Sequence, residues 1–216
     1  MTACSDNKIS ISYNDVKINC KDFEKYVNFY LGNKSDKDRI YEKVSDRWEV
    51  VVTTSEDDKL DHVSFVNGIY TFNGGKHVDT VSNHISKKLQ NYISTKGIKR
   101  KKHDIKVNHI KENMWIFLKS VIVNPSFDSQ TKERCITSQS KFGSKPVFSK
   151  KFLKDISNYT ELIDNILEAN SKNENKDAKK TDGKKKNKII VPKLDDANWA
   201  GTRKSEQCTL ILTEGD

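Results

Sequence analysis

Cysteine is scarce in this sequence, and its placement excludes a zinc-binding pattern. The four cysteines, Cys4, Cys20, Cys135 and Cys208, are scattered without a Cys-x-x-Cys pair or a histidine at ligand spacing. Structural zinc sites use such short spacings, and disulfides belong to oxidising compartments. We therefore expect free thiols in a reducing compartment and no zinc site.

Long apolar runs are also missing. No stretch reaches the roughly 18 apolar residues of a membrane span, and the start Met1–Ser5 lacks the basic and apolar regions of a secretion signal. Hydrophobic residues make up 34% of the 216 residues, which is low for a chain that is folded throughout. The sequence therefore predicts a soluble, intracellular protein with no membrane partner, part of which is solvated or without fixed structure.

Positive charge is present in excess. Lys and Arg number 39 against 30 Asp and Glu, which gives a formal net charge of +9. Two segments are strongly basic: Lys96–Lys106 has six cations against the single acid Asp104, and Ser171–Lys188 has eight Lys against three acidic residues. A basic balance allows binding to polyanions without establishing it, and a charge run is most often a solvated surface.

Strand and helix patterns alternate along most of the chain. Alternating or continuous apolar residues predict a hairpin and three strands, over Ile9–Ile18, Trp48–Thr53, His62–Phe72 and Trp115–Val123. Helical spacing predicts helices over Phe23–Leu31, Val78–Tyr92, Lys106–Asn113 and, as a pair or one bent helix, Phe148–Ala169. The hairpin turn is expected at Asn14-Asp15, and Ser55–Asp58 is expected to join the next two strands. This alternation indicates an α+β class around one sheet.

The basic segment Ser171–Lys188 interrupts the pattern. It has no large apolar side chain, so it cannot bury enough surface to offset the entropy lost on ordering. We expect a linker or an exposed loop there, which separates a domain over residues 1–170 from a new unit over residues 189–216. In that unit, Cys208–Thr213 predicts a strand that leads to Glu214.

A short polar loop follows the predicted strand Trp115–Val123. Pro125 has no N–H to donate and biases Asn124 toward an extended conformation, so the strand should end there. The loop then presents Gln130, whose amide donates two hydrogen bonds, and Lys132, whose ammonium can approach a phosphate oxygen. Residue chemistry alone favours a solvated turn, because short polar loops are common.

Several short motifs occur in one order along the chain: Asp46–Val50, Ser64–Ile69, Gly74–Asp79, Met114–Phe117, Gln130–Lys132, Phe142–Ser144 and Pro192–Asn198. In this order they resemble type IIA DNA topoisomerases, and Asp128-Ser129 before the loop is typical of the eukaryotic or large-virus branch. The resemblance covers about Ser10 to Asp216. It implies a ribosomal-protein-like transducer domain with one mixed sheet and packed helices, followed by the first strand of a TOPRIM α/β domain.

The resemblance also implies functional residues. In this family, the residues that match Gln130 and Lys132 reach the γ-phosphate of ATP, so Lys132 is expected to act in catalysis as well as in ATP binding. Glu214 matches an acidic TOPRIM residue that binds Mg²⁺ and assists proton transfer during DNA cleavage and religation. A lysine-rich loop of the family faces DNA, which implies DNA contacts from Lys99, Arg100, Lys101 and Lys102.

Two other acidic or histidine-containing motifs have simpler interpretations. His77 and Asp79 follow the Gly74-Gly75 turn and are expected to cap a helix, because no nucleophile stands beside them for a catalytic pair. The adjacent carboxylates Asp195-Asp196 are assigned to structure.

Together these features predict part of an ATP-dependent type II DNA topoisomerase, with ATP and Mg²⁺ as cofactors, double-stranded DNA as partner and a homodimer as the assembly. The nucleotide-binding residues of the family's ATPase domain and its nucleophilic Tyr are not found in this chain, so we expect a fragment that is inactive by itself. The alternative is a stand-alone basic nucleic-acid-binding module with the same fold. The expected location is the nucleus, or a viral factory or the cytoplasm if a virus encodes the protein.

Overall fold

The computed structural model describes residues 10–33, 38–57, 59–96, 105–182, 199 and 205–209. The chain divides into two compact units, Met1–Ala169 and Asn170–Asp216. All the strands in the described residues belong to the first unit.

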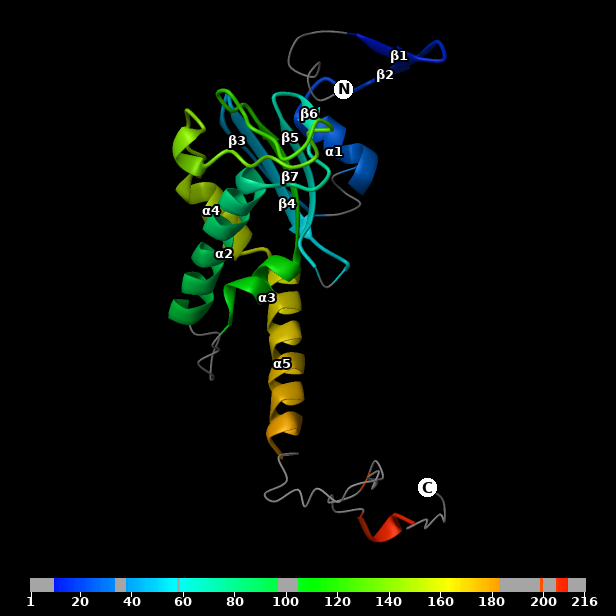
Figure 1. Cartoon of the computed structure of the whole chain (residues 1–216), viewed down its shortest axis with the longest axis vertical. Helices are drawn as coiled ribbons and strands as arrows, with labels where there is room; N and C mark the ends of the chain where they lie inside the picture. The colour runs from blue at the N-terminus through cyan, green and yellow to red at the C-terminus, as the bar shows by residue number, and fades with distance from the viewer. Residues whose placement is uncertain are drawn as a thin grey trace, which may run out of the picture. The chain divides into compact units, whose positions relative to one another are not determined.

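The described residues form seven strands, five α-helices and two short 3-10 helices (Figure 1). The strands are β1 (Ile11–Tyr13), β2 (Val16–Ile18), β3 (Ile40–Ser45), β4 (Trp48–Thr54), β5 (Asp61–Val66), β6 (Ile69–Tyr70) and β7 (Met114–Ser120). The α-helices are α1 (Phe23–Leu31), α2 (Lys76–Lys96), α3 (Val107–Glu112), α4 (Lys150–Ser157) and α5 (Thr160–Asp182). The 3-10 helices are η1 (Gln139–Lys141) and η2 (Ser205–Gln207).

A mixed five-stranded sheet in the order β3-β4-β7-β5-β6 forms the centre of the first unit. The central strand β7 runs antiparallel to β4 and parallel to β5. The strands β3 and β6 form the edges and are antiparallel to their neighbours. This mixed sheet with packed helices confirms the predicted α+β class, and β1 and β2 confirm the predicted hairpin.

The central strand is covered on both faces, because successive strand residues point to opposite sides. On one side, Ile116 and Leu118 pack in a cluster with residues of α2 and α4. On the other side, Phe117 packs with Phe23 and Val27 of α1. The sheet therefore lies between α1 on one face and α2 and α4 on the other (Figure 1).

The structure corrects the predicted strand over His62–Phe72. The chain turns at Asn67-Gly68, where φ is 52° and 80°, and this divides the segment into β5 and β6. Asn-Gly is a strong two-residue hairpin turn because both residues accept positive φ. The expected pairing across Ser55–Asp58 is also wrong, since β7 lies between β4 and β5. The edge strand β3 was not predicted.

The structure also corrects the expected loop or linker Ser171–Lys188 over residues 171–182, and residues 183–188 lie outside the described part of the chain. The helices α4 and α5 confirm the predicted helical pair, but α5 continues to Asp182. Its first turns are anchored in the core by Leu162, Ile163 and Ile166. Extending an existing helix costs less free energy than nucleating a new one, and the Lys, Glu and Ala residues of the segment 171–182 have high helix propensity.

Cys20, Cys135 and Cys208 are free thiols, and Cys4 lies outside the described residues. In the part of the chain that the structure describes, no group of three or more His, Cys, Asp or Glu side chains is placed to hold a metal ion. Nor is any helix in those ranges long and apolar enough to span a membrane. Cys208 and Thr209 follow η2 without strand geometry, and the rest of the predicted strand Cys208–Thr213 is outside the described residues.

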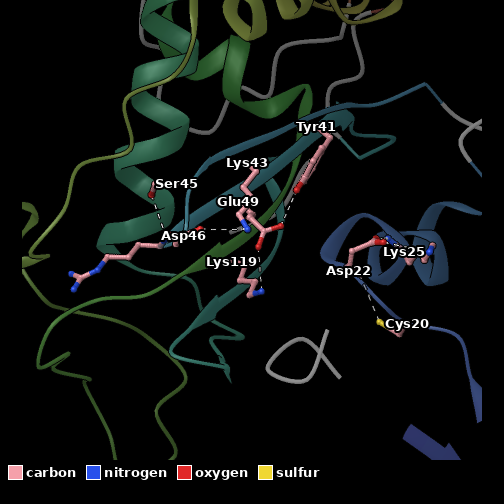
Figure 2. A network of polar contacts seen from close by, with 10 residues as sticks. Cys20, Asp22, Lys25, Tyr41, Lys43, Ser45, Asp46, Glu49 and Lys119 are labelled. Carbon is pink, nitrogen blue, oxygen red and sulfur yellow. Dashed lines mark hydrogen bonds and ion pairs between the residues drawn. The ribbon is translucent and has the colours of Figure 1, made fainter. Parts of the chain in front are cut away.

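Glu49 and Lys119 form a buried ion pair across β4 and β7 (Figure 2). Glu49 is only 4% exposed, and its Oε1 lies 3.2 Å from Lys119 Nζ. The Tyr41 hydroxyl donates to Glu49 Oε2 at 2.9 Å. The pKa of Tyr41 is raised, mainly by burial and to a smaller extent by this hydrogen bond. Both carboxylate oxygens are thereby paired, which offsets the cost of removing the charge from water.

The helix α2 begins with a buried histidine. His77 is fully buried, and its Nε2 lies 3.1 Å from the hydroxyl of Thr71, which in turn lies 2.7 Å from Ser64 Oγ. The ring of His77 therefore ties the first turn to the β5–β6 hairpin and does not cap the helix. Asp79 also lies in the first turn, where a carboxylate is favoured by the helix dipole.

The central strand gives a stability test. Ile116 is fully buried, whereas Ile136 is 48% exposed. We expect Ile116→Ala to lower the free energy of unfolding by about 2–5 kcal/mol, because it leaves a cavity in the core. Ile136→Ala is the matched control and should change it by less than about 1 kcal/mol. Urea denaturation of both variants measures the difference, and equal losses would contradict the core assignment.

The buried His77 predicts a pH dependence of stability. Burial lowers the pKa of His77 from 6.5 to about 3. Between these values the unfolded chain binds the proton that the folded chain excludes, so stability is lost as pH falls below about 6.5. The slope contributed by His77 approaches about 1.4 kcal/mol per pH unit. Unfolding free energies between pH 7 and 4 should show a shallower pH slope in His77→Asn, and an unchanged slope would refute the prediction.

Candidate functional site

Residues 128–134 form a closed loop. Phe127 and Cys135 pair as an antiparallel bridge at its base. Just inside the bridge, the N–H of Asp128 donates to the carbonyl of Arg134 at 3.2 Å. The two ends of the loop are therefore held side by side, and the residues between them project as one unit.

Lys132 has an unusual backbone conformation, with φ at 59°. A residue with a side chain pays about 1–2 kcal/mol in this left-handed region, and such residues cluster at functional sites. The conformation is supported by a turn in which the N–H of Lys132 donates to the carbonyl of Ser129 at 3.1 Å. The hydroxyls of Ser129 and Thr131 lie 2.8 Å apart inside the same turn.

The side chains of Gln130, Thr131 and Lys132 are all exposed. Among the residues that the structure describes, the ammonium of Lys132 has no ion-pair partner. An exposed, unpaired ammonium beside an amide and a hydroxyl can bind an anion through charge-assisted hydrogen bonds. Gln130 and Lys132 thus lie in one exposed loop, and their side chains carry hydrogen-bond donors that suit an anion.

The base of the loop is fixed to the start of α2. The carbonyl of Cys135 accepts from the N–H of Lys76 at 2.9 Å, and its own N–H donates to the carbonyl of Gly74 at 3.0 Å. Gly75 lies between these bonds with φ at 128°, and a Cβ there would be 2.1 Å from the Cys135 carbonyl oxygen. Glycine is required at this position because any side chain would collide with that backbone. From the sequence, Gly74-Gly75 was predicted only as a turn, and the contact with Cys135 was not.

A second link joins Asn73 to Glu133, the residue after Lys132. The N–H of Asn73 donates to the carbonyl of Glu133 at 2.9 Å, and Asn73 Nδ2 donates to Glu133 Oε2 at 2.9 Å. Sequence reasoning missed both residues. They are separated by 60 positions, so no local pattern could have indicated the contact.

The other predicted site residues lie outside the part of the chain that the structure describes. The predicted DNA-contacting residues Lys99, Arg100, Lys101 and Lys102 follow α2 in sequence and lie outside the described residues, as does Glu214.

Comparison with known proteins shows which family this chain is similar to. The family described as DNA gyrase B matches residues 20–187. The DNA topoisomerase 2 of Arabidopsis thaliana is 41% identical over 222 residues, and the probable DNA topoisomerase 2 of Dictyostelium discoideum is 42% identical over 212 residues. These alignments cover 100% and 96% of this chain but only 15% and 14% of the relatives.

Solved structures of topoisomerase II ATPase regions have a fold similar to that of this chain. The ATPase region of Saccharomyces cerevisiae topoisomerase II is 32% identical, with a TM-score of 0.64 over 74% of this chain and 39% of that one. The ATPase and transducer domains of Balamuthia mandrillaris DNA topoisomerase II are 29% identical, with a TM-score of 0.66 over 82% of this chain and 42% of that one. The chain therefore belongs to the DNA gyrase B family and is related to the ATPase region of type II DNA topoisomerases.

Proposed function

We propose that this chain is the transducer segment of an ATP-dependent type II DNA topoisomerase, in which the loop 128–134 senses the γ-phosphate of ATP. The observation that carries this proposal is the exposed Lys132 ammonium, unpaired among the described residues and held in a left-handed turn. The similarity to topoisomerase ATPase regions supports the nucleotide as the anion.

The chemistry of the loop suits a phosphate that is present before hydrolysis and absent after it. Lys132 supplies a compact positive charge, and the amide of Gln130 supplies hydrogen-bond donors without charge. A γ-phosphate concentrates negative charge that Lys132 can neutralise. When that phosphate leaves, the loop loses a charge-assisted partner, and the domain that carries it is released to move.

For the complete protein, the proposal is based on the similarity to DNA topoisomerases 2. The complete enzyme would be a homodimer, in the nucleus or in a viral compartment, that couples ATP hydrolysis to the passage of double-stranded DNA. Residues 189–216 would begin a TOPRIM domain, in which Glu214 would contribute to a Mg²⁺ site. Mg²⁺ would stabilise developing negative charge during DNA cleavage. Glu214 lies outside the described residues, and within them no group of three or more His, Cys, Asp or Glu side chains is placed to hold a metal ion.

Lys132→Ala tests the sensor role. We would place this chain in the matching segment of the Arabidopsis thaliana DNA topoisomerase 2 and measure ATP hydrolysis and DNA relaxation in the active chimera. Loss of a charge contact at the transferring phosphate should lower both rates, by on the order of 10²-fold. DNA binding should change little.

Lys141→Ala is the matched control, because Lys141 is an exposed lysine in η1 outside the loop. Alanine at position 132 carries the same Cβ as lysine, so the left-handed backbone is not itself the variable. Wild-type ATPase and relaxation rates for Lys132→Ala in the active chimera would refute the sensor proposal.

The proposed DNA contacts are tested by changing Lys99, Arg100, Lys101 and Lys102 to alanine together. If these residues contact phosphates, the 216-residue chain should bind duplex DNA more weakly, with a salt dependence shallower by up to roughly one slope unit for each lost contact. The matched control removes four positive charges elsewhere, by changing Lys184, Lys185, Lys186 and Lys188 to alanine. Equal effects of the two variants on affinity and slope would show that only net charge matters.

A further inference from the structure

We propose that Asn73 and Glu133 are positioning residues for Lys132, which hold the loop 128–134 to the start of α2 so that the two move as one body. This inference rests on the proposed phosphate-sensing role of the loop. The contact of Asn73 with Glu133 keeps the exposed Lys132 available to an anion. It also transmits a displacement of the loop to the rest of the domain.

The contact between Asn73 and Glu133 fixes direction as well as position. Asn73 binds the carbonyl of Glu133 through its backbone N–H and one carboxylate oxygen through Nδ2, each at 2.9 Å. Two bonds to one residue restrict its rotation. Because Glu133 directly follows Lys132, this restriction also limits the backbone of Lys132, whose φ is 59°.

Charge gives the contact a second role. Glu133 is a carboxylate beside the one ammonium in the loop that is proposed to bind phosphate. An unrestrained carboxylate there could pair with Lys132 or repel the incoming anion. The amide of Asn73 binds Glu133 without bringing a charge of its own, and Glu133 and Lys132 form no ion pair in the structure.

The other end of the contact is anchored in the sheet. Asn73 lies just before the Gly74–Lys76 backbone that bonds to Cys135. The next residue, His77, is fully buried and bonded to Thr71 of the β5–β6 hairpin region. A loop held at both points cannot shift at its base without carrying the first turn of α2, because packed elements move as rigid bodies.

The test uses ATP hydrolysis by the same chimera, together with thermal unfolding of the 216-residue chain. Asn73→Ala and Glu133→Ala should each lower kcat by roughly three- to tenfold, the effect of one lost hydrogen bond. Glu133→Gln should keep most of the activity, because its amide oxygen still accepts from Asn73. Ser138→Ala is the matched control: it removes an exposed hydroxyl pair with Ser140 and should leave kcat unchanged.

Combination with Lys132→Ala separates positioning from general support. If Asn73 acts through Lys132, Asn73→Ala should cause no further loss of kcat in a chain that already carries Lys132→Ala. The midpoint of thermal unfolding should be nearly the same in all these variants, since the contact is exposed.

The outcomes distinguish the two proposals. Impaired Lys132→Ala with normal Asn73→Ala and Glu133→Ala would overturn the positioning role alone. A loss in Asn73→Ala that adds fully to that of Lys132→Ala would overturn it as well, as would a Glu133→Gln variant as impaired as Glu133→Ala. Normal ATP hydrolysis by Lys132→Ala would instead refute the sensor function on which the positioning role rests.

Discussion

The pairing of β7 with both β4 and β5 is the interaction on which the rest of the structure depends. It joins an antiparallel half-sheet to a parallel pair and places apolar side chains toward both faces. It also fixes where the chain goes next: Val121 N–H donates to the Arg47 carbonyl and Ile122 N–H to Asn67 Oδ1, both at 2.8 Å. The segment that leads to the polar loop therefore leaves the sheet at a fixed point, the end of the central strand β7.

The position of the loop also depends on a close approach between two backbones. Only glycine at position 75 lets Cys135 reach the start of α2. The resulting bonds attach an exposed loop to the start of a helix, and proteins commonly position binding residues on loops held by such regular elements. The strain at Lys132 is tolerated because the turn around it is closed by its own hydrogen bonds.

Buried polar groups reinforce the same arrangement. Glu49, Lys119 and Tyr41 link three neighbouring strands, and His77, Thr71 and Ser64 link α2 to the β5–β6 hairpin. Each of these polar groups has its partner in another element. A shift of one element against the other would therefore leave a buried polar atom unpaired, so these contacts help to hold the elements in register. This makes the sheet and the start of α2 a suitable base for passing a displacement onward.

Local signals in the sequence determined the elements. Helical spacing gave α1, α2 and α3, Asn14-Asp15 gave the first hairpin, and a continuous apolar run gave β7. Pro125 and the polar residues after it marked the loop that carries Gln130 and Lys132. These features depend on neighbours within a few positions, so they can be read without the fold.

Only the tertiary structure decided the strand order, the edge position of β3 and the contacts of Gly75 and Asn73 with residues about sixty positions away. Such contacts depend on which surfaces meet when the core closes. Local propensity does not encode that choice, because the free energy of pairing comes from residues far apart in the chain.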